Sequence, residues 1–98
     1  GLRLLQRNYT TRYGEIDLVM RDKDATVFVE VRYRKRADYV DAINSIDIHK
    51  QRKLIRAAQH YLQHQRHHQL QAARFDVIAI SEQDKEPEIS WIKNAFEA

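Results

Sequence analysis

Cysteine is absent from this sequence, and only two glycines and one proline occur among its 98 residues. Without cysteine, neither a disulfide scaffold nor a zinc site built from thiolates can form, which fits a cytoplasmic protein. The shortage of glycine and proline argues against a flexible linker or a low-complexity segment. No apolar run approaches the ~20 residues that cross a membrane, and no signal peptide is visible, so we expect no membrane partner.

Length and charge set further limits. A chain of 98 residues is long enough for one modest core and too short for two, so we expect a single domain over residues 1–98. The net charge of +3 is too small to indicate a nucleic-acid partner by itself. A nucleic-acid partner is therefore indicated only by where the charges lie along the chain.

The strongest local pattern is a β-hairpin over residues 14–34. Apolar and polar residues alternate in two runs, and the polar stretch Asp22-Lys23-Asp24 separates them. Alternation in β-branched and aromatic residues, interrupted by Asp-rich turn chemistry, is typical of a strand, a turn and a second strand.

A turn at residues 22–25 predicts the register of this hairpin, in which four pairs face each other: Arg21 and Thr26, Val19 and Phe28, Asp17 and Glu30, Glu15 and Arg32. Carboxylates placed opposite each other destabilise a sheet, so Asp17 and Glu30 need a compensating partner. A magnesium ion could serve, because Mg²⁺ is usually held by one or two carboxylates and substrate phosphates. The alternative is a solvated sheet face with a weak surface ion pair between Glu15 and Arg32.

The rest of the chain predicts strands near residues 2–8, 74–80 and 88–92 and a helix over about 48–67. Asp47 is expected to cap that helix through its side chain. In the apolar strand RFDVIAI, Asp76 is interpreted as a structural residue bonded locally rather than as an outer ligand of the site. The prediction is thus an α+β fold, with a mixed sheet led by an antiparallel meander and one long helix packed on it.

Basic residues gather after the hairpin and on the predicted helix. Between Ile48 and Phe75 there is no carboxylate, whereas the stretch holds all five histidines. One sign of charge over so long a stretch indicates a surface for phosphates, stronger below pH ~6.5 as histidines protonate; a solvated helix back is the alternative. The predicted nucleic-acid contacts are Arg34, Lys35, Arg36, Lys53 and Arg56.

Two further groups of side chains have open interpretations. Arg7 and Arg12 are either solvated or lie beside the site as phosphate contacts. His64 could share a metal with His60 or with His68 at a spacing of four residues, but no third ligand accompanies either pair, so we do not predict a structural zinc site.

The segments GEIDLV, VFVEVRYR, HKQRKL, RFDVIAI and WIKNAF follow in this order between Leu2 and Phe96, and they resemble the YraN family of small, uncharacterised bacterial proteins. The resemblance implies a restriction-endonuclease-like fold, related to archaeal Holliday-junction resolvases, with the PD-(D/E)XK nuclease pattern. The resemblance implies that Asp17 and Glu30 correspond to the two acidic residues of that pattern. Val31 corresponds to the position whose backbone carbonyl often completes the metal shell. Glu15 matches the family's GEID element.

The chain departs from this pattern in two ways. Related folds place a helix before the first strand, often with another active-site Glu, and we expect that helix to be missing from the sequence given. The lysine of the pattern is replaced by Arg32, which could clamp a phosphate but could not act as a base. Lys50, at the start of the predicted helix, is a candidate substitute.

These observations predict a metal-dependent nuclease-like protein that acts on DNA, including branched or structured DNA by analogy with resolvases. The predicted catalytic residues are Glu15, Asp17, Glu30, Arg32 and Lys50, and Mg²⁺ or Mn²⁺ is the expected cofactor. Two alternatives stay open: a nucleic-acid-binding module without catalysis, and an adaptor whose edge strand pairs with a partner. The sequence leaves the oligomeric state open, a dimer included.

Overall fold

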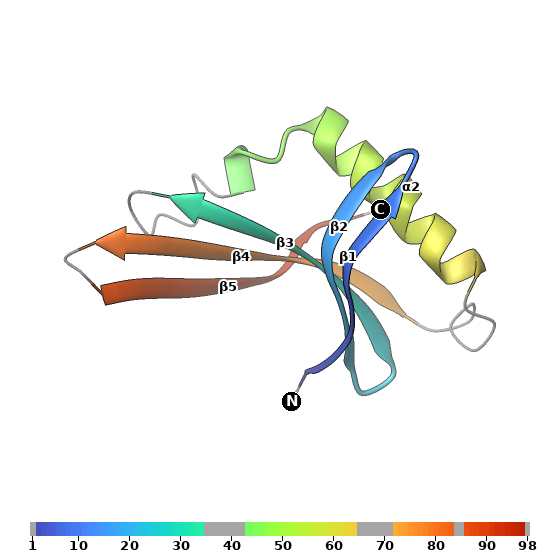
Figure 1. Cartoon of the computed structure of the whole chain (residues 1–98), viewed down its shortest axis with the longest axis horizontal. Coiled ribbons are helices and arrows are strands. Elements are labelled where there is room, and N and C mark those ends of the chain that lie inside the picture. The colour runs from blue at the N-terminus through green and yellow to red at the C-terminus, as the bar shows by residue number, and fades with distance from the viewer. Residues whose placement is uncertain (1, 35–42, 65–71, 84–85, 98) are drawn as a thin grey trace.

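The computed structural model describes residues 2–34, 43–64, 72–83 and 86–97 (Figure 1). Its elements are β1 (Arg3–Thr11), β2 (Gly14–Asp22), β3 (Ala25–Arg34), α2 (Ile48–Gln63), β4 (Ala73–Gln83) and β5 (Glu86–Phe96). The strands form a five-stranded sheet in the order β1-β2-β3-β4-β5. Only β3 and β4 are parallel neighbours, joined by the crossover that contains α2. The predicted α+β class and the mixed sheet with its antiparallel meander are confirmed.

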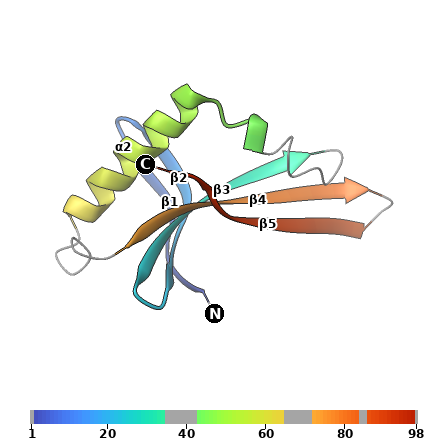
Figure 2. The same ribbon diagram turned by 180° about the vertical axis from the view of Figure 1, so that it is seen from behind.

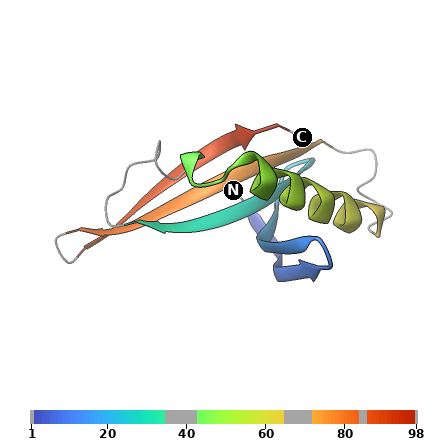
Figure 3. The ribbon, with the colours of Figure 1, turned by 90° about the horizontal axis from the view of Figure 1, so that it is seen from above.

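Helix α2 lies across one face of the sheet (Figures 2 and 3). Its buried residues Leu54, Ala58 and Tyr61 belong to the same core cluster as Val19 and Phe28 of the sheet. The Tyr61 ring meets the Phe28 ring edge-on, with centroids 5.8 Å apart. Successive side chains of a strand point to opposite faces of the sheet, so Val19 of β2 and Phe28 of β3 point to the face that α2 covers.

The start of α2 is fixed by the predicted cap. The side chain of Asp47 accepts a hydrogen bond from the backbone N–H of Lys50 at 2.9 Å, which satisfies one of the free donors of the first turn. The helix ends at Gln63, before the predicted end near residue 67, and His64 forms its C-cap. Within the described part of the chain, no helix is both long and apolar enough to cross a membrane.

The first strand is longer than predicted. β1 continues to Thr11, and the turn to β2 is made by Arg12 and Tyr13. The reason is local, because the Thr11 hydroxyl accepts from the Tyr13 N–H and donates to the Gly14 carbonyl, at 3.0 and 3.1 Å. The turn between β1 and β2, called here the β1–β2 tip, thereby extends far enough to reach α2 (Figure 1).

A buried carboxylate holds the junction of β4 and β5. Asp76 is fully buried and accepts hydrogen bonds from Arg74 Nε at 3.1 Å, Trp91 Nε1 at 2.8 Å and the Asn94 N–H at 3.0 Å. The pairing of β4 with β5 is irregular at this point, between Phe75 and Val77. The structural role predicted for Asp76 is confirmed, although its partners extend beyond its own strand.

Candidate functional site

The β2–β3 hairpin has the predicted register in its inner part. Arg21 lies opposite Thr26, and Val19 lies opposite Phe28. The ladder then ends at Leu18 and Val29, so the two outer pairs that we predicted do not form. Beyond this point β2 bends away with β1 toward α2, while β3 continues beside β4 (Figure 1). The hairpin therefore opens into a fork at the position of the predicted site.

Asp17 lies at this fork. Its Oδ2 accepts a hydrogen bond from the backbone N–H of Val31 at 2.8 Å. The carboxylate takes the place of the strand partner that Val31 has lost on this side, which is how a backbone donor stays satisfied where a ladder stops. Two of the three predicted metal-binding residues are therefore in contact.

Glu15 is not where the sequence placed it. It pairs with Thr10 of β1 and is exposed, whereas Arg32 forms its ion pair with Glu30 instead. The prediction that Glu15 faces Arg32 is wrong, because it extended the ladder past the fork. Glu15 lies near the β1–β2 tip, which approaches the helix and diverges from the end of β3.

Glu30 is the buried acidic group of the site, with 6% of its surface exposed. Its Oε1 lies 3.6 Å from Arg32 Nη2 and 3.7 Å from Lys50 Nζ, so both predicted cations reach it. Its Oε2 is buried and has no hydrogen-bond partner among the described residues. Burial, followed by the charge of Asp17, raises the pKa of Glu30, and the two cations offset only part of that rise.

The raised pKa predicts that Glu30→Gln stabilises the protein near neutral pH. A carboxyl whose folded pKa exceeds its ordinary 4.5 adds stability below that pH, and the contribution is lost as the pH rises through the folded pKa. Glutamine keeps the shape of the neutral form and removes the charge that the site disfavours. Thermal denaturation should show a higher midpoint for the variant near pH 7, with the difference vanishing near pH 4. A lower midpoint near neutral pH would show that Arg32 and Lys50 outweigh the burial.

The other predicted residues that the structure describes lie on α2 and at the end of β3. Lys53 and Arg56 are exposed on α2, and Arg34 is the last residue of β3. Lys35 and Arg36 lie outside the described residues, as does His68. Over the described ranges, no three His, Cys, Asp or Glu side chains gather closely enough to hold a metal by themselves. A metal at Asp17 and Glu30 would need further ligands from the Val31 carbonyl, water or substrate.

The exposed side of α2 carries a stacked histidine pair. The rings of His60 and His64 lie 4.2 Å apart, and His64 Nδ1 is 2.7 Å from the His60 carbonyl. His60 Nδ1 is hydrogen-bonded to the Tyr9 hydroxyl at 2.5 Å, which ties the helix to β1. These contacts engage one ring nitrogen of each histidine in structural hydrogen bonds.

A cleft between the hairpin tip and α2 was not predicted. Its volume is about 230 Å³, and it is lined by Tyr13, Arg56, Gln59, His60 and Gln63. No local pattern brings the Tyr13 turn to the middle of the helix, because the contact depends on how far β1 and β2 extend. The hints in the sequence are the helix itself, whose charges are all basic, and the interpretation of Arg12 and Arg56 as phosphate contacts.

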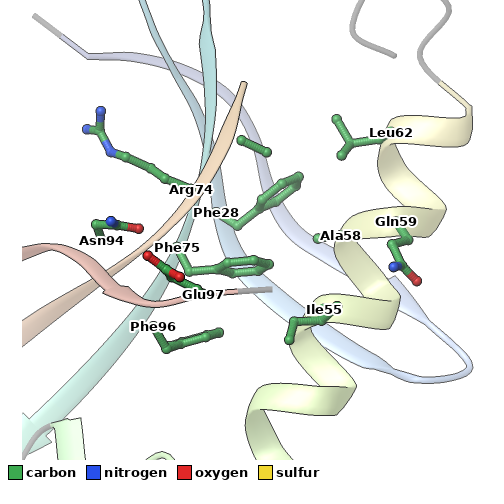
Figure 4. A pocket seen from close by; sticks show the side chains of 11 residues that line it. Phe28, Ile55, Ala58, Gln59, Leu62, Arg74, Phe75, Asn94, Phe96 and Glu97 are labelled. Carbon is green, nitrogen blue, oxygen red and sulfur yellow. The ribbon is translucent and has the colours of Figure 1, made fainter. Parts of the chain in front are cut away.

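A larger cavity, of about 330 Å³, opens between α2 and the start of β4 (Figure 4). Three aromatic side chains, Phe28, Phe75 and Phe96, form much of its wall, and Arg74 and Glu97 also line it. It contains none of the predicted site residues. It is an apolar extension of the core beside the helix rather than a site for charged substrates.

Comparison with known proteins gives one consistent family. Residues 1–80 match the profile of the uncharacterised protein family UPF0102. Similar proteins, each named only as a UPF0102 protein, occur in Stutzerimonas stutzeri (50% identity, covering 100% of this chain and 82% of the relative) and in Nitrosococcus oceani (51%, covering 98% and 77%). A relative in Methylococcus capsulatus is 50% identical over 100% of this chain and 78% of its own length.

Proposed function

Since this chain belongs to the uncharacterised protein family UPF0102, which is the YraN family, we propose that it is a metal-dependent nuclease-like protein acting on DNA. The observation that carries the proposal is the pair of acidic residues at the fork, Asp17 and Glu30. They come from adjacent strands, and the charge of Asp17 acts on the buried Glu30.

The chemistry of this pair fits a hard divalent cation. Glu30 Oε2 is buried without a hydrogen-bond partner among the described residues, an arrangement that costs free energy unless something else compensates it. Mg²⁺ needs few protein ligands, since substrate phosphates and water complete its shell. Asp17, Glu30 and the Val31 carbonyl would hold Mg²⁺ or Mn²⁺ here.

Such a cation would stabilise the negative charge that develops on the phosphate and lower the pKa of a water molecule. Arg32 would bind a phosphate oxygen, because its guanidinium stays charged and donates in a fixed geometry. Lys50, whose Nζ lies 3.7 Å from Glu30 Oε1, would supply the ammonium that position 32 lacks. Asp17 would also hold the Val31 backbone in place through their hydrogen bond.

A restriction-endonuclease-like core is part of the same proposal. A mixed sheet with an antiparallel β1–β2–β3 meander, followed by a helical crossover to a parallel β4, is compatible with a restriction-endonuclease-like core. Acidic residues on β2 and β3, at the point where the strands diverge, would then be the paired carboxylates of the PD-(D/E)XK pattern. Branched or structured DNA is the substrate suggested by analogy with resolvases.

The test is cleavage of linear and branched DNA with Mg²⁺ or Mn²⁺, comparing the wild type with Glu30→Gln. We expect cleavage by the wild type only, with a loss of roughly 100-fold or more in the variant, because the amide is a poor ligand for a hard cation. Mg²⁺ should raise the thermal midpoint of the wild type and leave that of Glu30→Gln unchanged. Equal cleavage by both proteins would refute the assignment of Glu30.

One observation favours a second candidate, a nucleic-acid-binding module without catalysis. Arg32 and Lys50 both place a cation beside Glu30 Oε1, and such ion pairs could neutralise the carboxylate without any metal. Calorimetry separates the two functions. Salt-sensitive DNA binding, with no Mg²⁺ binding that depends on Glu30, would support the module.

A further inference from the structure

We propose that the cleft between the β1–β2 tip and α2 is a second contact point for the nucleic acid and binds a backbone phosphate through Arg12 and Arg56. This inference rests on the proposed function, since it supplies a path for the strand away from Asp17 and Glu30. It adds to that function a cleft lined by Tyr13 and Gln59, which the sequence had not suggested, and by His60, one of the helix histidines already interpreted as part of a surface for phosphates.

Two guanidinium groups lie against the Tyr13 ring: that of Arg56, which lines the cleft, and that of Arg12, which lies beside it. The Cζ atoms of Arg12 and Arg56 lie 4.9 and 5.8 Å from the centroid of the Tyr13 ring. Arg12 also donates a hydrogen bond from Nη2 to the Tyr13 hydroxyl at 2.8 Å, which fixes its position. The ring attracts each cation through its quadrupole, but it cannot cancel the repulsion between them. An anion bound between the two would do so.

No negative group in the described part of the chain takes that role. Neither Arg12 nor Arg56 forms an ion pair with a described carboxylate, although Arg32, Lys50 and Arg74 all do. The helix offers none, since the sequence has no carboxylate from Ile48 to Phe75. The two guanidinium groups are therefore available for a phosphate, and a guanidinium group can bind a phosphate through bidentate hydrogen bonds.

The place of the cleft on the helix connects it to the carboxylates. The hairpin tip rests on α2, where a Cβ added at Gly14 would lie 3.7 Å from Lys53 Cβ. Lys50, at the carboxylate site, precedes Arg56 by about 9 Å of helix axis at ~1.5 Å per residue. That distance is close to the rise of three nucleotides, at roughly 3.4 Å each along one strand of B-form DNA. One strand could contact both places, with Lys53 between them.

Two glutamines extend the cleft beyond the cations. Gln59 and Gln63 are exposed, lie one helical turn apart and line the same cleft as Tyr13. Their amide groups can donate to phosphate oxygens or bind base edges without adding charge. A polar cleft of this size beside two arginines fits a phosphodiester better than an apolar ligand, and the phosphate could belong to a single strand or to a duplex.

The proposal is tested by fluorescence anisotropy with labelled single-stranded and duplex oligonucleotides in EDTA, so that catalysis plays no part. We expect Arg56→Ala to weaken binding roughly tenfold and to reduce the slope of log K against log salt by about 0.7 for a single strand or 0.9 for a duplex. The matched control is Arg3→Ala, which removes the same charge from an exposed residue at the other end of β1. It should change the affinity less than about twofold. The oligonucleotide that shows the larger loss identifies the source of the phosphate.

Two outcomes would overturn the proposal: an affinity for Arg56→Ala equal to that of Arg3→Ala, or no binding of either oligonucleotide by the wild type at about 50 mM salt. Tyr13 provides a second variant. Tyr13→Ala should weaken binding as Arg56→Ala does, whereas Tyr13→Phe should weaken it less, because the ring remains and only the hydroxyl that Arg12 binds is lost. Failure of the nuclease proposal is recognised separately, since Arg56-dependent binding without any cleavage leaves the cleft assignment standing. Cleavage that persists while Arg56→Ala behaves as the control would reject the cleft alone.

Discussion

Asp17→Asn is expected to reduce the proposed DNA cleavage by roughly 100-fold or more, while leaving the protein folded. The amide oxygen of asparagine can still accept the Val31 N–H, which Asp17 binds at 2.8 Å, so the backbone at the fork should keep its position. What disappears is one of the two negative charges that would hold a cation. The loss should therefore appear as weaker metal binding and slower cleavage, not as unfolding.

The same substitution has a second, independent effect. Because the charge of Asp17 contributes to the raised pKa of Glu30, that pKa should fall toward its ordinary value in Asp17→Asn. A titration of the Glu30 side chain by NMR measures it. Asp24→Asn is the matched control, since Asp24 is exposed in the turn of the same hairpin and should change neither cleavage nor the pKa of Glu30. Equal cleavage by Asp17→Asn and the wild type would refute the role of Asp17.

Asp76→Ala is expected to cause the largest loss of stability, about 3–5 kcal/mol in the free energy of unfolding. The carboxylate is fully buried and accepts hydrogen bonds from Arg74, Trp91 and the Asn94 backbone. Removing it leaves these donors without their partner, and the guanidinium of Arg74 keeps only its 2.9 Å contact with Asp22. A buried donor without an acceptor costs more than the hydrogen bond contributed, because its desolvation is no longer compensated.

Urea denaturation measures this loss directly. The control Asp24→Ala makes the same change at an exposed position and should stay within about 0.5 kcal/mol of the wild type. Asp76→Asn should also be destabilising, because the NH₂ group of the asparagine would face the N–H donors that now bind the Asp76 carboxylate. A loss below about 1 kcal/mol for Asp76→Ala would mean that water replaces the carboxylate at this junction.

Local chemistry made much of the fold predictable. The Asp-rich turn fixed the inner register of the hairpin, and Asp47 marked the start of α2, because turns and caps depend on neighbouring residues alone. The residues that the helix buries, Leu54, Ala58 and Tyr61 among them, recur at helical spacing. Asp17 and Glu30 were identified from the same local pattern, together with the resemblance to a nuclease family.

Long-range effects were not predictable in the same way. The ladder between β2 and β3 was expected to continue, and nothing in either strand indicates that it ends at Leu18 and Val29. That ending depends on the bend of β1 and β2 toward α2, which a residue pattern does not encode. For the same reason, the contact of Arg56 with the Tyr13 ring and the partners of Asp76 on β5 were missed. Each joins elements that meet only after the sheet and the helix have packed.

The short turn between β2 and β3 has an evolutionary consequence. Leu18 and Met20 are apolar too and lie against the opposite face of the sheet, so hydrophobicity alone would tolerate a slip by one residue. Such a slip would bury Leu18 and Met20 beside the helix and move Asp17 away from Val31. An insertion next to Lys23 would thus disturb the fork even though it is remote from both acids, whereas a replacement of that lysine would leave the register unchanged. Among related sequences, the length of this turn should therefore vary less than the identity of its residues.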